Sequence, residues 1–229
     1  MLDQTTSKGR IIAAAMKAAG EAPWADVTLP DIAKAAEVSL VELRDAFASK
    51  GEILAAFVRA VDDEVLARVP AGTSEEAARD RLFEVVMSRF DLLAPYKAAL
   101  KSIRAAWPVE PALMAAMASS QTWMLRAAGI PADGLEGQMR AAGLGAVYAS
   151  VFRTWLEDDD PGLARTMAVL DRRLRRGERT LKTLDEIKGR VGDIAGLFKR
   201  APKRAHESEP ESAPTSAGAP DSPPPATPA

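Results

Sequence analysis

The sequence predicts an all-α protein, and three observations support this fold class. Apolar residues recur at intervals of three and four along most of the chain, and alanine, the strongest helix former, is abundant. The strict alternation of apolar and polar residues that marks a strand is missing. Proline and glycine fall between the periodic segments, where they would end one helix and precede the next.

The N-terminal part of the chain contains four predicted helices. They are expected over residues 6–20, 28–36, 39–47 and 50–69. Thr28 and Ser39 are predicted N-caps of the second and third helices, because a hydroxyl oxygen can accept a hydrogen bond from a free N–H of the first turn. These short helices predict a small N-terminal domain that ends near residue 65.

The next part of the chain predicts a larger helical body. Its helices are expected over residues 74–93, 95–106, 108–128, 134–157 and 161–184. Thr73 or Ser74, followed by Glu76, supplies a start signal for the first of them. Four prolines lie near expected helix starts, where a missing N–H does no harm: Pro95, Pro108, Pro131 and Pro161.

Two further segments follow the body. Residues 185–200 predict an amphipathic helix with the apolar stripe Ile187, Val191, Ile194, Leu197 and Phe198. Residues 172–204 hold twelve Lys/Arg against four Asp/Glu, a pattern typical of a helix that lies on an anionic membrane surface. Packing on the body and contact with nucleic acid are the alternatives. Residues 201–229 contain no Leu, Ile, Phe or Trp and are expected to be disordered.

Composition argues against several classes of enzyme. Cysteine is absent, and the single histidine, His206, lies in the predicted tail. A thiolate zinc site, a histidine metal site and a Ser-His-Asp triad are therefore not expected in the folded part. No catalytic residue, metal or cofactor is predicted. The chain begins without a signal-peptide pattern and has no apolar run of membrane-spanning length, so we expect a cytoplasmic protein.

Residues 10–54 carry the most informative motif, which includes WADVTLPDIAKAAEVSLVELRDAFASKGEIL from Trp24 to Leu54. This stretch resembles the N-terminal domain of the tetracycline-repressor (TetR) family. The resemblance implies a helix-turn-helix domain over residues 1–65 and a ligand-binding and dimerisation body over residues 66–184. The candidate DNA-binding residues are Lys8, Arg10, Thr28, Lys34, Ser39, Leu40, Arg44 and Lys50.

The presumed DNA-facing side departs from the family pattern. Glu37 stands in the turn where family members usually have glycine, and Glu42 and Asp45 put carboxylates on the predicted recognition helix. Residues 1–64 hold seven Lys/Arg and eleven Asp/Glu, a net charge of −4 that works against binding to phosphates. Arg44 is nevertheless suited to a bidentate contact with guanine. The alternative is that these charges are solvated helix residues.

Large apolar side chains at helical spacing run through the body. The candidate ligand-pocket residues are Met87, Phe90, Trp107, Met117, Trp123, Tyr148, Phe152 and Trp155. Methionine and aromatic residues often line adaptable apolar pockets, so an apolar small-molecule ligand is expected. The same residues would equally serve as ordinary core and dimer interface, and the two interpretations do not exclude each other.

A second resemblance begins at Arg140, in RAAGLGAVYASVFRTWLEDDDPGLARTMAVLDRRL. It is similar to the lipid-binding accessory protein family of ubiquinone biosynthesis, which shares the TetR-type fold. That resemblance implies an isoprenoid-like ligand in the body and a C-terminal helix on the membrane surface.

Two functions therefore remain open. The first is a ligand-responsive, DNA-binding transcriptional regulator, and the second is a lipid-binding accessory protein peripheral to the membrane. We expect no enzyme activity from either. A homodimer is predicted through residues 134–157 and 161–184, whose proposed contact residues are Leu144, Val147, Tyr148, Val151, Leu163, Met167 and Leu170.

Overall fold

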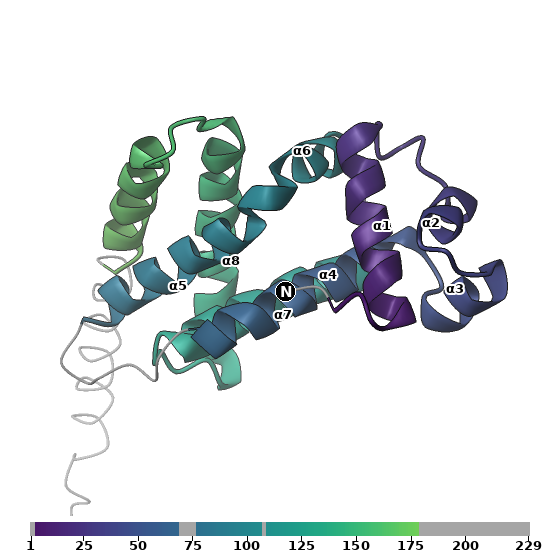
Figure 1. Ribbon diagram of the computed structural model, residues 1–229. Coiled ribbons are helices and arrows are strands. Elements are labelled where there is room, and N and C mark those ends of the chain that lie inside the picture. Colours follow the sequence, from purple (N-terminus) through teal and green to yellow (C-terminus); the bar gives the residue numbers. More distant parts are fainter. Residues whose placement is uncertain (1–2, 69–76, 107–108, 179–229) are drawn as a thin grey trace, which may run out of the picture. The chain divides into compact units, whose positions relative to one another are not determined.

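The computed structural model describes residues 3–68, 77–106 and 109–178. Helices form all the regular secondary structure of these residues, as the sequence predicted. The described residues belong to one compact unit, which Figure 1 shows with the N-terminal helices at one end of α4. None of these helices is both long and apolar enough to cross a membrane.

Three short helices form the N-terminal domain: α1 (Ser7–Glu21), α2 (Leu29–Ala35) and α3 (Leu40–Ala46). Each contributes residues with almost no exposed surface, among them Ile11, Ile32 and Leu43, to one apolar core. The predicted ranges of 6–20, 28–36 and 39–47 agree with these helices to within one or two residues at each end.

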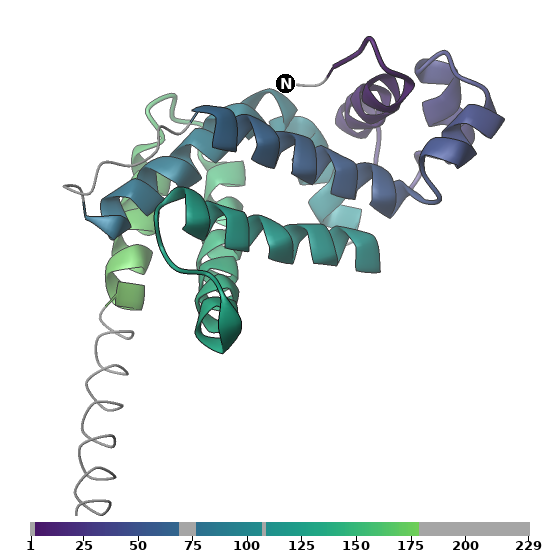
Figure 2. The same cartoon turned by 90° about the horizontal axis from the view of Figure 1, so that it is seen from below.

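The body consists of α4 (Lys50–Arg68), α5 (Ala78–Leu93), the 3-10 turn η1 (Ala94–Tyr96), α6 (Lys97–Ala106), α7 (Pro111–Ala127) and α8 (Gly134–Glu157). Helices α4 and α7 lie side by side along most of their length (Figure 2). Helix α6 packs against α1 of the N-terminal domain. The N-terminal domain is thus joined to the body through both α4 and α6.

Four predicted helix starts in the body differ from the structure. The helix expected from residue 74 begins at Ala78, and the helix expected from Pro161 begins at residue 164. The segment expected to begin a helix at Pro95 instead forms the 3-10 turn η1, with Pro95 near its start. The α-helix follows from Lys97. The helix expected from Pro108 begins at Pro111, which takes the N-terminal position where proline is well tolerated. Helix α8 has the predicted bounds.

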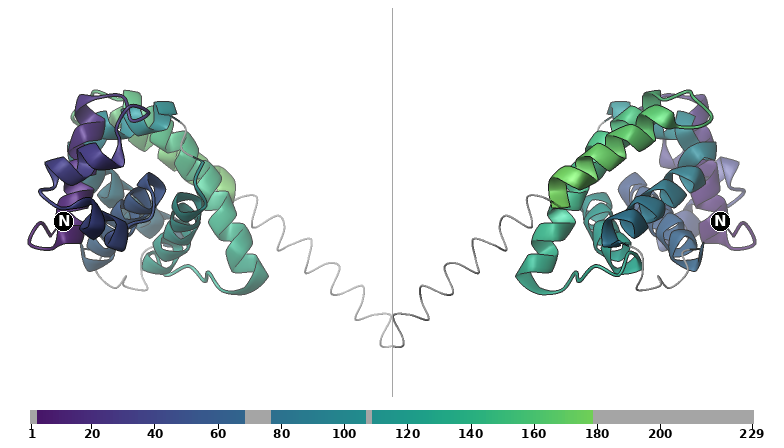
Figure 3. Two further views of the ribbon diagram at one scale, coloured as in Figure 1. Left: turned by 90° about the vertical axis from the view of Figure 1, so that its right-hand side faces the viewer. Right: turned by 90° about the vertical axis from the view of Figure 1, so that its left-hand side faces the viewer.

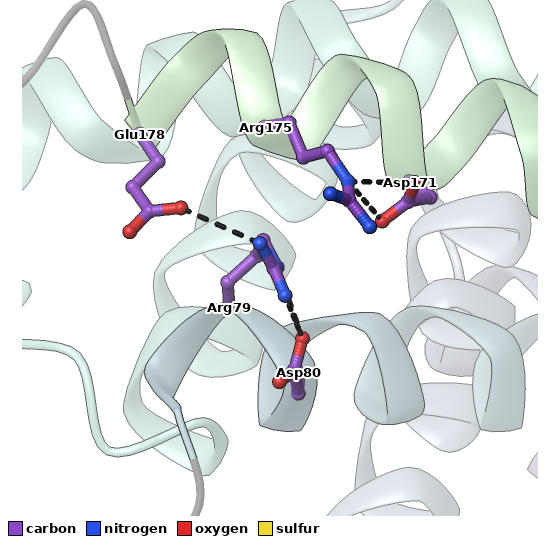
Figure 4. Close-up of polar contacts among 5 residues, drawn as sticks. All are labelled: Arg79, Asp80, Asp171, Arg175 and Glu178. Atoms are coloured by element: carbon purple, nitrogen blue, oxygen red, sulfur yellow. Dashed lines mark hydrogen bonds and ion pairs between the residues drawn. The ribbon is translucent and has the colours of Figure 1, made fainter.

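A further helix over residues 164–178 packs beside α5 and α8, and the right-hand view of Figure 3 looks onto it. At its start, Asp158 Oδ2 accepts hydrogen bonds from the backbone N–H and the hydroxyl of Thr166, at 2.8 and 2.6 Å. At residue 178, the last one described in this helix, Glu178 lies 3.7 Å from Arg79 of α5 (Figure 4). Polar contacts therefore attach this helix to the body at its start and again at residue 178.

The Asp158 contact makes one stability contribution pH-dependent. The hydrogen bonds from Thr166 lower the pKa of Asp158 below its ordinary value. A carboxyl group whose folded pKa is depressed contributes its full stabilisation above the unfolded pKa of about 3.9, and loses it as the pH falls through the folded value. We expect part of the acid destabilisation below about pH 4 to disappear in Asp158→Asn, measured as melting temperature against pH. An unchanged pH profile in this variant would contradict the assignment.

Several predictions fall outside the described residues. They concern the start signal at 73–76, Trp107 and Pro108, the amphipathic helix over 185–200 with its proposed membrane stripe (Ile187, Val191, Ile194, Leu197 and Phe198), and the tail over 201–229. The predicted end of the last body helix at residue 184 also lies outside them.

Candidate DNA-binding surface and body cavity

Capping boxes begin both helices of the helix-turn-helix. The Thr28 hydroxyl accepts a hydrogen bond from Asp31 N, and the Asp31 carboxylate accepts one from Thr28 N. Ser39 and Glu42 form the same reciprocal pair, with Glu42 Oε2 2.8 Å from Ser39 N. Backbone and hydroxyl hydrogen bonds from Ser39 lower the pKa of Glu42. The predicted N-caps are confirmed, and Glu42 has a structural role that the sequence analysis did not assign to it.

The turn between α2 and α3 contains a strained residue. Glu37 has a φ of +54°, the left-handed region that favours glycine. The backbone N–H of the next residue, Val38, donates to Ala33 O at 3.0 Å, so the turn is held closed from the preceding helix. Glutamate in place of the family's glycine therefore costs conformational free energy in the turn and also adds a negative charge.

We expect Glu37→Gly to raise the free energy of unfolding by about 0.5–1 kcal/mol, because relief of left-handed strain exceeds the added entropy of the unfolded chain. Urea unfolding at constant m value would measure it. Glu37→Ala is the matched control, since it removes the charge but keeps the Cβ. An equal gain in both variants would attribute the effect to charge rather than to backbone strain.

Helix α3 presents an outer face of mixed character. Leu40 and Val41, two adjacent apolar residues in its first turn, are 54% and 57% exposed. The Arg44 side chain is 73% exposed and pairs with Asp45 at 2.9 Å. This face thus offers apolar groups and one guanidinium, and a neighbouring carboxylate competes for that guanidinium.

Two predicted DNA-binding cations are engaged within the protein. Arg10 Nε donates to Ala36 O, at the end of α2, over 3.3 Å. Lys50 Nζ donates to the carbonyl oxygens of Trp24 and Val27, both at 2.6 Å, and lies over the Trp24 ring. Burial lowers the pKa of Lys50. The expectation that Lys50 contacts phosphate does not fit this arrangement, because its donors hold the loop after α1.

The remaining predicted cations, Lys8 and Lys34, are exposed on α1 and α2. With Arg44 they are the candidate cations whose side chains lie exposed on the surface. The surface that could face DNA is therefore smaller than the sequence analysis proposed.

Two hydrogen-bonded contacts connect the N-terminal domain to the segment around α6 and α7. Ser102 of α6 accepts from Trp24 N at 2.8 Å and donates to Ala22 O at 3.0 Å. Glu110, just before α7, accepts from the Ser49 hydroxyl at 2.7 Å and from Gly51 N at 2.9 Å. Neither residue was predicted from the sequence, because each contacts a partner about 60 to 80 positions away.

Glu110 reaches the first turn of α4 because position 51 has no side chain. A Cβ at Gly51 would lie 2.0 Å from Glu110 Oε2. The carboxylate therefore adds a long-range cap at the positive end of α4 to the local one from Ser49, whose hydroxyl accepts from Glu52 N at 3.2 Å. We call Ser102 and Glu110 the two interdomain contacts.

A cavity of about 440 Å³ lies in the body among α4, α5, α6, α7 and α8. Its walls are mainly apolar, and this volume falls in the range of small-molecule sites. The apolar wall residues include Leu54, Phe57, Leu93, Leu100, Ile103, Leu113, Met114, Met117 and Phe152. Polar groups line it as well, namely Arg89, Arg104, Ser120, Gln121, Tyr148 and Arg153.

A buried polar cluster joins four helices beside this cavity. Arg89 of α5 forms an ion pair with Asp62 of α4 and donates to the Tyr148 hydroxyl of α8 at 3.0 Å. Ser120 of α7 donates to Asp62 at 2.7 Å. Burial raises the pKa of Asp62, although the guanidinium of Arg89 opposes this shift. Gln121 Oε1 is buried next to the cluster and has no hydrogen-bond partner among the described residues.

Seven of the eight predicted pocket residues, all except Trp107, lie within the described ranges, and they divide into three groups. Met117, Tyr148 and Phe152 line the cavity, and their role in ligand binding stays a prediction. Phe90 and Trp155 do not line it, because they are almost fully buried and stack on each other at 5.3 Å in the core. Met87 is partly buried against the core, and Trp123 is 44% exposed beside Arg126.

One signal for the polar cluster was present in the sequence. Arg89 lies on the apolar stripe of its helix, between Val85 and Phe90, and Asp62 lies between Val61 and Val65 on the buried side of α4. A charged residue inside an apolar stripe indicates a buried pair, although the sequence does not show which residues pair.

Comparison with known proteins identifies the N-terminal domain. Residues 11–57 match the family model of bacterial regulatory proteins, tetR family. The N-terminal domain belongs to this family. The match covers α1 and the helix-turn-helix, so the TetR-type frame predicted from the sequence is confirmed.

Solved structures extend the TetR-type fold to the body. The TetR transcriptional regulator from Nitrosomonas europaea ATCC 19718 is 24% identical, with a TM-score of 0.58 over 75% of this chain and 97% of that one. One from Rhodococcus sp. RHA1 is 20% identical, with a TM-score of 0.58 over 76% and 96%. A tetR-family regulator from Streptomyces coelicolor is 14% identical, with a TM-score of 0.55 over 87% and 91%. At these identities the likeness shows the fold.

The second resemblance receives no support from these comparisons. None of the reported matches is to a ubiquinone-biosynthesis accessory protein. No curated protein matches the chain. The lipid-binding accessory function therefore rests on the sequence resemblance alone.

Proposed function

We propose that this protein is a dimeric, DNA-binding transcriptional regulator of the TetR type whose DNA affinity responds to a ligand in the body cavity. The observation that carries the proposal is the capped helix-turn-helix with an exposed α3. Its first turn presents Leu40 and Val41, which suit contact with thymine methyl groups, and its last turn presents Arg44, which suits guanine.

The two interdomain contacts support a route from the cavity to α3. Ser102 lies in α6 next to Ile103, which lines the cavity, and Glu110 lies next to Val109, which also lines it. A ligand that displaces these wall residues would shift the loop after α1 and the start of α4 together. Its effect on DNA affinity could not exceed the difference between its binding free energies for the original and the shifted arrangement of these segments.

An exposed apolar face of α8 supports a homodimer. Leu135 and Met139 are 74% and 59% exposed. The exposed residues Ala142 and Ala146 follow at helical spacing and extend the same face. This face differs from the predicted one, because Leu144, Tyr148, Val151 and Leu170 are buried in the chain's own core. Of the seven residues proposed for the interface, Met167 is exposed, while Val147 and Leu163 pack partly against the core.

Gel-shift titration of the full-length chain with genomic DNA fragments tests the DNA-binding proposal. Once a specific fragment is found, Arg44→Ala should weaken its binding by about 1–3 kcal/mol and relax base preference. Lys34→Ala is the comparison variant, since loss of a phosphate contact should weaken all sequences similarly and lower the salt dependence. Absence of any bound fragment at low salt would refute the proposal.

A further inference from the structure

The charged side chains that line the body cavity are all positive. Three arginines line it, Arg89, Arg104 and Arg153, and none of its lining residues is Asp or Glu. The chain as a whole has a net charge of −2, so this excess of positive charge is local. A cavity that is otherwise mainly apolar therefore carries a single sign of charge.

The three arginines are not equivalent. The charge of Arg89 is compensated by Asp62 in the buried cluster. Arg104 is exposed on α6 and Arg153 on α8, and neither contacts a carboxylate within the described ranges. Arg153 Nε donates only to Ala149 O of its own helix, at 3.3 Å. The guanidinium groups of Arg104 and Arg153 thus remain available to a ligand on the exposed side of the cavity.

Such an arrangement selects for a particular ligand chemistry. The apolar walls favour a hydrocarbon body, and two uncompensated guanidinium groups favour an acidic group at the exposed end. A neutral apolar ligand would gain nothing from these two arginines, and a cationic ligand would be repelled by them.

We propose that the cavity binds an amphiphilic anion, with an apolar body among α4, α6 and α7 and an acidic group held by Arg104 and Arg153. This inference deepens the proposed function, because it rests on the same cavity and specifies the chemical class of its ligand.

Isothermal titration calorimetry on the full-length chain tests the proposal with three probes of equal chain length: decanoate, decan-1-ol and decyltrimethylammonium. Decanoate should bind roughly tenfold or more tightly than decanol, as expected for charge-assisted hydrogen bonds. The cationic probe should bind most weakly. Higher salt should weaken decanoate more than decanol.

Matched variants assign the effect to the two arginines. Arg104→Ala with Arg153→Ala should reduce decanoate affinity to that of decanol and leave decanol unchanged, while lysine at both positions should retain part of the preference. Arg165→Ala with Arg172→Ala, which removes two exposed arginines outside the cavity lining, is the control and should leave decanoate binding unchanged. Equal binding of decanoate and decanol, or unchanged decanoate binding in the cavity double variant, would overturn the proposal.

The gel shift separates this inference from the proposed function. DNA binding by a chain that shows no preference for decanoate would overturn the ligand class and leave the regulator intact. Arginine-dependent decanoate binding by a chain that binds no DNA fragment would support the ligand class and refute the regulator.

Discussion

Asp62→Ala should lower the free energy of unfolding by about 3–5 kcal/mol, the largest stability change that we expect from a single substitution in this chain. Arg89 would lose the one carboxylate that compensates it among the described residues, while its guanidinium remains buried, with just 5% of the side chain exposed. The Tyr148 hydroxyl would remain as its neighbour, but a neutral hydroxyl does not offset a buried charge. Urea unfolding at constant m value would measure the loss.

Rescue by a second substitution distinguishes an unpaired charge from a simple loss of packing. Asp62→Ala combined with Arg89→Met removes the buried charge and keeps an unbranched apolar side chain, so the double variant should recover much of the lost stability. Asp62→Asn retains the volume and the contact with Ser120, and it should lie between the wild type and Asp62→Ala. A loss below about 1 kcal/mol in Asp62→Ala would show that water already solvates the pair.

Ala146→Glu should dissociate the proposed dimer and abolish specific DNA binding. Ala146 lies on the exposed apolar face of α8. A two-fold axis brings the same patch of both subunits together, so two new carboxylates would face each other in the interface. A cost of about 3 kcal/mol would raise the dimer dissociation constant roughly a hundredfold.

Sedimentation or light scattering would measure the subunit mass, and gel shift the DNA affinity. Ala67→Glu is the matched control, because it adds the same charge at an exposed position of α4 and should leave the mass unchanged. If the dimer persists in Ala146→Glu, the interface does not include this face of α8. A wild-type chain that is monomeric at micromolar concentration would refute the dimer itself.

Local sequence rules predicted the N-terminal domain well, because its determinants lie within a few residues of each other. Thr28 and Ser39 cap their helices through partners three positions away, so spacing alone identifies them. Glu37 stood out as a non-glycine in the turn, and its positive φ explains the family's preference for glycine there. The bounds of α8 also followed from composition and periodicity.

Tertiary structure decided which apolar residues of the body serve the core, the cavity and the proposed dimer. Helix α8 is apolar on most of its circumference, so periodicity cannot distinguish the buried Val151 from the cavity residue Phe152 or the exposed Met139.

Contacts between residues far apart in the sequence likewise decided the roles of the charged side chains. The sequence by itself determined the helices, their caps and the helix-turn-helix frame, since hydrogen bonds between near neighbours specify these features. Lys50 became a loop anchor, Glu110 a cap for α4 and Arg89 a buried partner of Asp62 only through residues at least 23 positions away. The reason is physical: the free energy of a charged side chain depends on the dielectric and the partners that packing brings to it, and neither is encoded in its immediate neighbours.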